Sequence, residues 1–240
     1  MKIFYLTILA FYLSINILPA QNFDLGSWNI LNLSYQHNEK WSFFGEAQLR
    51  SLKFYSDFHY YEYKGAINYK VAKNVKLTIG AGSYQTYNEG GNFVEPKLND
   101  EFRLWPQVIL YQSIGKLNIE QRYRAEFRFT SMGYRNRFRY RLGVSYPFGK
   151  EMNGYKHFQI GASNEIFFTD KEPYFERIRF QVALSYKPSK ATTLQTGYVH
   201  QFDYQINDET GRDFLQIGFF IEMFNKKWKN SFHEIELKDN

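Results

Sequence analysis

The sequence predicts an all-β protein, an antiparallel up-and-down transmembrane β-barrel of 10–12 strands. Apolar and polar residues alternate with a period of two through eleven segments of the chain. These segments run 11 to 14 residues. Globular strands usually have about 5 to 6 residues, and tilted membrane strands need about 9 to 11. Aromatic residues are 20% of the chain. Many stand near segment ends, as in the aromatic girdles of membrane barrels: Tyr35, Trp41, Tyr69, Tyr111, Phe127, Phe129, Tyr146, Phe167, Phe168 and Tyr186.

The chain begins with the layout of a secretory signal peptide. A short positive start precedes an apolar run over residues 3–17, and Pro19-Ala20 stands before Gln21. We expect cleavage after Ala20, with an N-terminal membrane anchor as the alternative. The run is short for a membrane helix, which needs about 20 residues. The expected organisation is a signal peptide over 1–20, an outer-membrane β-barrel over 21–225 and a charged C-terminal tail over 226–240.

The alternating segments define the expected strands in order. The first four carry aliphatic, aromatic and small residues on one face, as Phe43, Gly45 and Ala47 show. The next three carry mostly charged residues on the other face, and the last four return to a mixed polar face. The expected strands are 25–36, 41–54, 60–70, 75–86, 98–111, 117–129, 135–146, 156–168, 176–186, 192–204 and 213–224.

The connections alternate in length. Short turns are expected at 37–40, 71–74, 113–116 and 187–191, and longer polar loops at 88–97, 169–175 and 206–212. This pattern is typical of an up-and-down barrel with short turns at one rim and long loops at the other. Membrane barrels usually have an even number of strands. Eleven segments therefore leave ten or twelve strands open, and we favour twelve.

Alternation alone does not distinguish a membrane barrel from a soluble sheet. A soluble sheet packs its apolar face inward, whereas a membrane barrel turns it toward lipid and its polar face toward the lumen. The long segments and aromatic ends favour the barrel. We therefore predict an exported protein in the outer membrane of a Gram-negative bacterium, with membrane lipid as its partner and a soluble periplasmic β-sheet binding protein as the alternative.

Charged residues concentrate on the polar face of the central strands. Ten of the twelve Arg residues lie between Arg103 and Arg179, together with four Glu residues on the same face. This arrangement predicts a charge network in the lumen. Its expected members are Glu101, Arg103, Glu120, Arg122, Arg124, Glu126, Arg128, Arg135, Arg137, Arg139, Arg141, Glu165, Arg177 and Arg179.

Strand pairing sharpens this expectation. A tight hairpin around 131–134 sets three pairs opposite each other: Glu126 with Arg137, Arg124 with Arg139, and Arg122 with Arg141. Across 113–116 we expect Glu101 opposite Arg124 and Arg103 opposite Arg122, and Glu165 near Arg137 and Arg177. Directly opposed like charges destabilise a sheet, so the crowded Arg residues need diagonal Glu residues, water or an anion.

Two interpretations of this lumen remain open. In the first, Arg–Glu pairs fill the barrel and are structural. In the second, the lumen takes up a small anionic solute, since Arg-lined pores favour anions. The function we expect is a structural or small-solute transport role, with anions as the candidate solutes. Basic residues that match lipid phosphates are a further possibility.

A barrel-type lipid-modifying enzyme is the alternative function. A nucleophile needs a base within hydrogen-bond reach, and the chain has five His residues. His157 shares a face with Ser163, but six residues along one strand span about 20 Å. His200 stands on the apolar face of its strand. We therefore expect no catalytic residue, although the question of enzymatic activity stays open.

The composition narrows the remaining classes. The absence of Cys excludes a disulfide scaffold, a thiolate metal site and a lipid-anchored Cys. The His and Asp residues form no cluster with metal-ligand spacing, so we expect no metal and no cofactor. The net charge of +6 suggests nucleic acid. Export and a basic lumen account for that charge, and we expect no nucleic-acid partner.

The central stretch resembles a known bacterial family. Three of its segments are Glu101-x-Arg103-x-Trp105-x-Gln107, residues 120–128 and residues 134–142, and Asn164-Glu165 and Gly197-Tyr198 follow them. Together they resemble the family known as domain of unknown function 2490, over roughly residues 24–224. The resemblance implies an exported β-barrel in the outer membrane and implies no particular activity.

Overall fold

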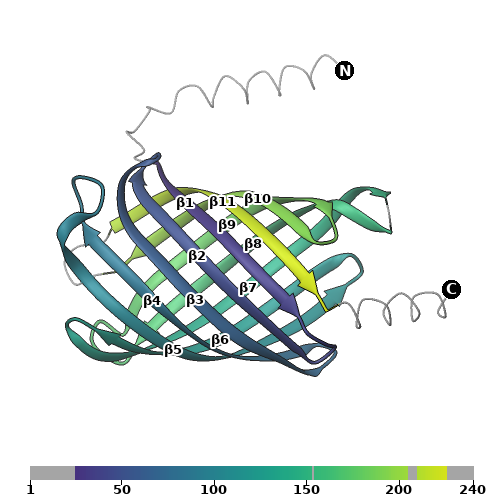
Figure 1. Ribbon diagram of the computed structural model, residues 1–240, viewed down its shortest axis with the longest axis horizontal. Coiled ribbons are helices and arrows are strands. Elements are labelled where there is room, and N and C mark those ends of the chain that lie inside the picture. Colours follow the sequence, from purple (N-terminus) through teal and green to yellow (C-terminus); the bar gives the residue numbers. More distant parts are fainter. Residues whose placement is uncertain (1–24, 153, 205–209, 226–240) are drawn as a thin grey trace, which may run out of the picture.

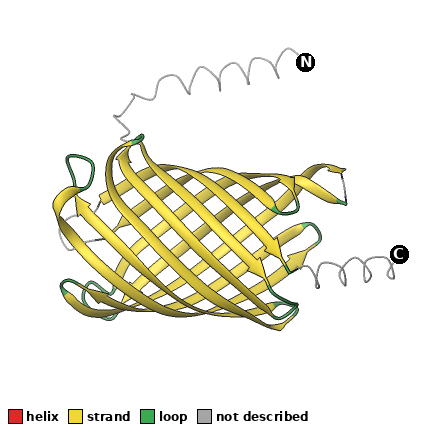
Figure 2. Cartoon of the chain, in the orientation of Figure 1, coloured by secondary structure: helices red, strands yellow, loops and turns green. Residues whose placement is uncertain are grey.

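The computed structural model describes residues 25–152, 154–204 and 210–225. Within these ranges the chain forms eleven strands and no helix, and the strands close into one barrel (Figures 1 and 2). The predicted all-β barrel is therefore confirmed. The expected signal peptide (1–20) and tail (226–240) lie outside the described residues. The strands are β1 (Leu25–Gln36), β2 (Trp41–Lys53), β3 (Ser56–Ala72), β4 (Val75–Asn88), β5 (Val94–Ile114), β6 (Leu117–Thr130), β7 (Gly133–Met152), β8 (Tyr155–Thr169), β9 (Phe175–Ser189), β10 (Thr192–Asp203) and β11 (Thr210–Phe224).

No helix long and apolar enough to cross a membrane occurs among these residues.

The barrel closes through a parallel pair. Each strand pairs antiparallel with its neighbour in the chain, and β1 also pairs with β11 in parallel, from Leu25 opposite Asp213 to Gln36 opposite Phe224. The preference for twelve strands was wrong. In an up-and-down order of eleven, the first and last strands run in the same direction, and their parallel pairing closes the sheet without a twelfth strand.

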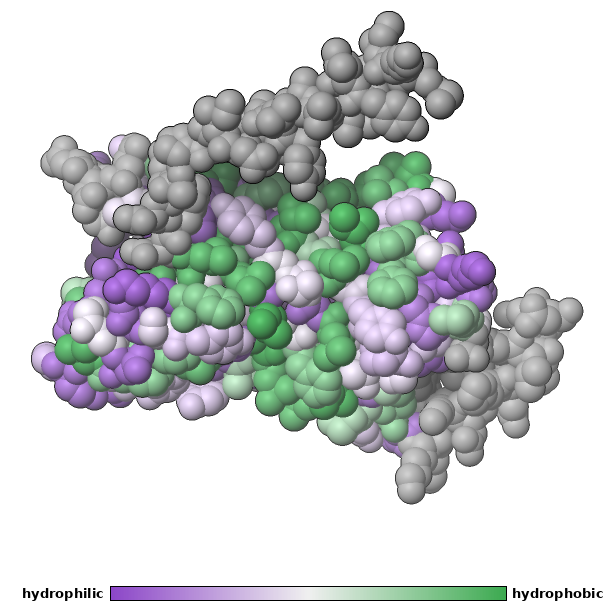
Figure 3. All heavy atoms as spheres, turned by 90° about the horizontal axis from the view of Figure 1, so that it is seen from above, coloured by the Kyte–Doolittle hydropathy of each residue, from purple (hydrophilic) through white to green (hydrophobic). Residues whose placement is uncertain are grey.

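The two faces of the sheet are inverted relative to a soluble protein. Along β5, Glu101 and Arg103 point inward and are buried, while the alternate residues Phe102 and Leu104 point outward and are exposed. Polar and charged residues outnumber apolar ones among the buried residues described. On the visible outer face, hydrophobic residues cover the middle and hydrophilic residues gather toward both ends (Figure 3).

The two rims differ as expected. The turns after β1, β3, β5, β7 and β9 lie at one rim, the short-turn rim. The connections after β2, β4, β6 and β8 lie at the other, the long-loop rim, and they include the loops at 89–93 and 170–174 (Figure 1). Two of them, at 54–55 and 131–132, are tight turns. Among the connections that the structure describes in full, the two longest therefore lie at the long-loop rim, although not every connection there is long.

Aromatic residues occupy both faces. At the short-turn rim Trp41 packs against Tyr69, with ring centroids 4.7 Å apart. Two residues expected in the outer girdle, Tyr111 and Phe167, instead point inward and line the lumen, and Phe167 is 1% exposed. Phe167 and Phe168 are both aromatic, so hydropathy does not distinguish which of them faces inward.

A close backbone approach supports the inner packing of β4 and β5. Gly80 lies opposite Trp105, and a Cβ at this position would stand 2.3 Å from a carbon of the indole ring. Trp105 packs with Ala66 and Tyr84 in a small apolar cluster inside the barrel. Gly80 is therefore required by the space that Trp105 occupies.

We predict that Gly80→Ala destabilises the barrel by about 1–3 kcal/mol, because the added methyl overpacks the Trp105 site. The matched control is Gly45→Ala on the outer face, where an added Cβ has no atom within 4 Å. Urea unfolding of the barrel in detergent, followed by tryptophan fluorescence, measures both. Equal midpoints for the two variants would contradict the packing argument.

Candidate functional site

A cavity of about 1360 Å³ occupies the barrel lumen. Its lining extends from Gln36 and Lys76 near the short-turn rim to Met132 and Pro173 at the long-loop rim. Of the fourteen network residues expected from the sequence, thirteen line this cavity, and the remaining one, Glu126, is fully buried in the wall. The structure thus places all fourteen on the inner face.

Glu126 on β6 stands among four guanidinium groups. Its carboxylate lies 2.6 Å from Arg139, 3.5 Å from Arg124, 3.6 Å from Arg137 and 3.8 Å from Arg103. These residues come from β5, β6 and β7, so one buried carboxylate ties three adjacent strands together. Breaking a buried ion pair by removing one partner typically costs about 3–5 kcal/mol.

Glu101 holds a second cluster closer to the long-loop rim. Arg103 donates to it through Nε at 2.7 Å and Nη2 at 2.9 Å. Arg128 donates to both of its oxygens as well, with Nη2 at 2.8 Å. Such two-pronged pairing fixes geometry as well as charge, because the planar guanidinium matches the carboxylate.

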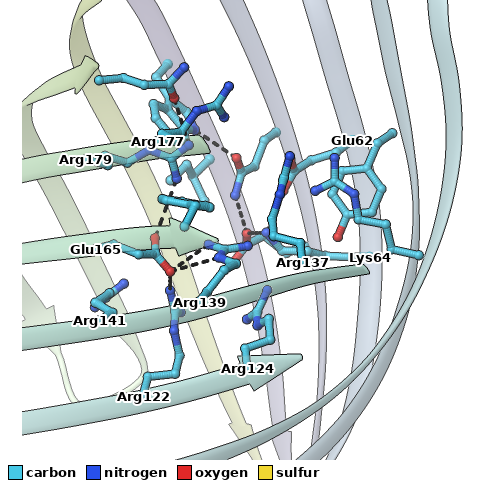
Figure 4. A pocket seen from close by; sticks show the side chains of 18 of the residues that line it. Glu62, Lys64, Arg122, Arg124, Arg137, Arg139, Arg141, Glu165, Arg177 and Arg179 are labelled. Atoms are coloured by element: carbon cyan, nitrogen blue, oxygen red, sulfur yellow. Dashed lines mark hydrogen bonds and ion pairs between the residues drawn. The ribbon is translucent and has the colours of Figure 1, made fainter. Parts of the chain in front are cut away.

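Glu165 on β8 holds a third cluster (Figure 4). It accepts from Arg122 at 2.6 Å and from Arg139 at 2.8 Å, and Arg179 lies 3.7 Å away. The expectation that Glu165 lies near Arg137 and Arg177 was wrong. In the register of β7, β8 and β9, Glu165 is opposite Arg141 and Arg179.

The register of the central strands was only partly predicted. The β6–β7 pairing is confirmed, with Glu126 opposite Arg137 and like charges opposed at the next two levels. The β5–β6 expectation was wrong: Glu101 lies opposite Thr130, and Arg103 opposite Arg128. The two-residue turn at Gly115-Lys116, where Gly115 has φ of 59°, pairs Ile114 directly with Leu117 and thereby shifts the partners.

The sequence reasoning missed two acidic residues at the strand ends. Glu176, the second residue of β9, accepts two hydrogen bonds from Arg137 and lies 3.6 Å from Arg128. Asp203, at the end of β10, accepts from Arg177. Asp203 stands on the polar face of its strand, so the alternation already carried its signal. Glu176 has the parity of the outward Ile178, and it reaches the lumen at the register shift where Phe168 pairs with Phe175. The positive excess of the network is correspondingly smaller than the sequence suggested.

A fourth charged cluster lies on β2 and β3 and consists of Glu46, Arg50, Glu62 and Lys64. Lys64 bridges Glu46 and Glu62 at 2.5 Å each, and Arg50 lies 3.3 Å from Glu62. The Arg50 guanidinium also stacks on Trp28, 3.6 Å from the ring centroid. This side of the lumen therefore has its own balanced ion pairs, which the sequence analysis placed on the polar face but left out of the network.

Buried rings support the guanidiniums where acids are lacking. The Phe167 ring faces four of them at 4.6 to 5.7 Å, from Arg137, Arg139, Arg177 and Arg179. On the opposite wall Arg103 lies 3.7 Å from the Tyr84 ring. Cation–π contact is strongest for desolvated cations, so these inward rings stabilise buried Arg.

The lumen is not fully neutralised by its own acids. Within the described residues, fifteen Lys or Arg and nine Asp or Glu line the cavity. Among the described residues, five guanidiniums keep a buried nitrogen without a hydrogen bond, at Arg50 Nε, Arg122 Nε, Arg128 Nη1, Arg141 Nε and Arg179 Nε. A cavity with this excess attracts anions and repels cations.

The two candidate bases, His157 and His200, do not line the main cavity, whereas His59 is buried against it. His157 Nδ1 contacts the Lys187 carbonyl at 2.7 Å, and its Nε2 has no hydrogen-bond partner. His200 points outward and contacts Asp213 at 2.8 Å. In the described part of the chain, no Ser or Thr hydroxyl bonds either imidazole. Neither His is thus placed against a nucleophile.

We predict that Glu126→Gln destabilises the barrel by about 3–5 kcal/mol, because it removes a buried carboxylate shared by four guanidiniums and leaves Arg124 without a carboxylate within 4 Å. The matched control is Glu120→Gln, whose carboxylate is 31% exposed and has one cation, Arg141, at 3.5 Å. A further control, Lys97→Ala, removes a pair with exposed Asp100 and is expected within about 0.5 kcal/mol of wild type.

Urea unfolding in detergent measures the three variants. Coincident midpoints for Glu126→Gln and Lys97→Ala would show that the buried network contributes nothing to stability.

Comparison of the chain with curated proteins and with solved structures gives no match. A family match covers residues 25–212, which run from the start of β1 to the first residues of β11. The family is described as Protein of unknown function (DUF2490). It is the family that the central motifs resemble, and most of the barrel lies within the match. The chain belongs to the DUF2490 family.

Proposed function

We propose that this protein is a β-barrel of the outer membrane of a Gram-negative bacterium, and that its arginine-rich lumen admits small anions. The observation that carries the proposal is the inversion of the two faces, with apolar side chains outside and ionised side chains inside.

The outer face supports membrane insertion. Large apolar side chains are exposed on all eleven strands, among them Leu31, Tyr63, Phe102 and Ile217. A soluble protein rarely exposes apolar patches beyond a few hundred Å², because such surfaces associate. In a bilayer these exposed apolar side chains contact lipid instead of water, and a closed sheet leaves no unpaired backbone edge in the hydrocarbon region. The soluble periplasmic alternative requires the opposite arrangement of faces.

The lumen supports an anionic solute. The cavity is lined from rim to rim and carries more cations than acids. Rings of Arg or Lys favour anions in pores. The inner wall is narrowed by paired charges, so we expect the lumen to pass or hold ions of a few heavy atoms.

Membrane insertion predicts an effect of depth along one strand. Leu104→Lys, at the middle of β5, should cost about 2–4 kcal/mol in lipid, because a charge at mid-bilayer is desolvated. The control is Ile114→Lys at the last residue of β5, where the cost should be about 1 kcal/mol or less. Both wild-type side chains are exposed, at 42% and 68%.

Membrane fractionation with a heat-modifiability gel reads out this prediction. Wild type should run in the outer-membrane fraction as a compact band that shifts on boiling, and Leu104→Lys should lose most of that band. A soluble wild type with both variants unchanged would remove the membrane proposal.

The lumen proposal predicts ion selectivity. Purified protein in a planar bilayer should carry current with chloride favoured over potassium in 0.1 M KCl. The preference should weaken in 1 M KCl, since the Debye length falls from about 10 Å to about 3 Å. The reversal potential under a salt gradient measures it. Cation preference, or no current from protein that gives the folded band, would exclude anion passage.

A further inference from the structure

We propose that a small oxyanion binds on Arg122 and Arg141, at the inner end of a vestibule that opens from the short-turn side of the lumen. This inference rests on the proposed anionic solute and adds its place and chemical class. The vestibule is a cavity of about 320 Å³ between β5 and β10.

The lining of the vestibule differs from the rest of the lumen. Small and uncharged residues form most of it, and Glu120 and Arg141 are its charged members. The neutral polar side chains that line it are Gln112, Ser113, Asn118, Ser145, Gln159, Ser163, Gln181, Ser185 and Gln195. The vestibule therefore combines open space with neutral hydrogen-bonding groups, and it borders the arginine cluster of the lumen at Arg141.

Arg122 and Arg141 are the arginines of β6 and β7 that lie closest to the short-turn rim. They are directly opposed across β6 and β7, an arrangement that destabilises a sheet unless a negative group lies between or beside them. Arg122 shares the Glu165 carboxylate with Arg139 and Arg179. In the described chain Arg141 lies within 4 Å of one carboxylate, Glu120 at 3.5 Å, and both of these side chains are 31% exposed. Glu165 is opposite Arg141 on β8, but its carboxylate is within 4 Å of other arginines instead.

Both guanidiniums keep unused donors. Arg122 Nε and Arg141 Nε are buried without a hydrogen-bond partner. Elsewhere in the network Arg103 and Arg128 use two nitrogens each on Glu101. The Arg122–Arg141 pair thus combines excess positive charge, free donors and adjacent open space.

This chemistry suits an oxyanion better than a halide. Two planar guanidiniums present paired N–H groups that match the oxygens of a phosphate or carboxylate. Ser163 and Gln181 lie one level closer to the short-turn rim. The Ser163 hydroxyl, 3.5 Å from Gln181 Oε1, can rotate to donate to a further oxygen, and the Gln181 amide has a second N–H beside the one that bonds Gln216. Inorganic phosphate is the probe that meets these features with the fewest atoms.

The test is calorimetric titration of inorganic phosphate into the full-length barrel in a non-ionic detergent at low salt. Wild type should show one saturable site. Arg141→Gln should bind at least about tenfold more weakly, because a charge-assisted pair of hydrogen bonds is lost. The matched control is Arg212→Gln at the long-loop rim, where Arg212 is 35% exposed and pairs with Glu89 at 2.6 Å.

The control should retain wild-type affinity, and each variant must give the heat-modifiable band. Equal affinity in wild type and Arg141→Gln, or no saturable binding in wild type, would overturn the site. Phosphorylcholine should bind more weakly than phosphate, since its quaternary ammonium meets a cationic wall. Tighter binding of phosphorylcholine would assign the site to lipid headgroups and overturn the free oxyanion.

The experiments distinguish a failure of the proposed anion passage from a failure of the proposed oxyanion site. Phosphate binding without anion current would remove passage and keep the site. Chloride-selective current without phosphate binding would remove the site and keep the selective lumen.

Discussion

Burying guanidinium groups inside a closed sheet is the constraint on which the rest of this structure depends. An ion taken out of water loses several kcal/mol of solvation, and only close countercharges and hydrogen bonds offset that loss. Here each acid serves several cations: Glu126 meets four guanidiniums, and Glu165 meets three. Because these partners come from β5 to β9, the ion pairs also hold neighbouring strands in one register. The most highly charged part of the lumen wall is consequently also the part in which ion pairs connect the most strands.

The distribution of acids divides the lumen along its length. Glu101 and Glu176 balance the arginines nearest the long-loop rim, while Arg141 at the other end of the layer relies on a half-exposed Glu120 at 3.5 Å. Beyond Arg141 the wall consists of small and amide side chains around open space. A uniform structural plug would distribute its acids evenly. The sparse acids around Arg141 agree with the proposed oxyanion site at this end of the arginine cluster.

Local patterns in the sequence predicted the features that local physics controls. Period-two alternation identified the eleven strands and the inner face, and the turn at 131–132 fixed Glu126 opposite Arg137. The β5–β6 register was misplaced because it depends on which residues form the turn, and Gly115 starts it. The parallel β1–β11 pair joins strands at opposite ends of the chain, so no local spacing encodes it. Glu176 was missed because it follows the outward parity of β9 and reaches the lumen only through a register shift that alternation does not encode.

The parallel pair of β1 and β11 needs additional stabilisation, since parallel pairs are slightly less stable per residue than antiparallel ones. Trp28 on β1 contributes to it from inside the barrel. Its ring packs edge-on against Phe214 of β11 at 5.7 Å, and its indole N–H donates to Gln48 of β2 at 2.9 Å. Arg50 and Arg179 stack on the same ring at 3.6 and 4.7 Å. One side chain thereby connects β1 to β2, β9 and β11. Through Arg50 it contacts the charged cluster of β2 and β3, and through Arg179 it contacts the Glu165 cluster. The pairing of β1 with β11 is therefore flanked by charged clusters on both sides.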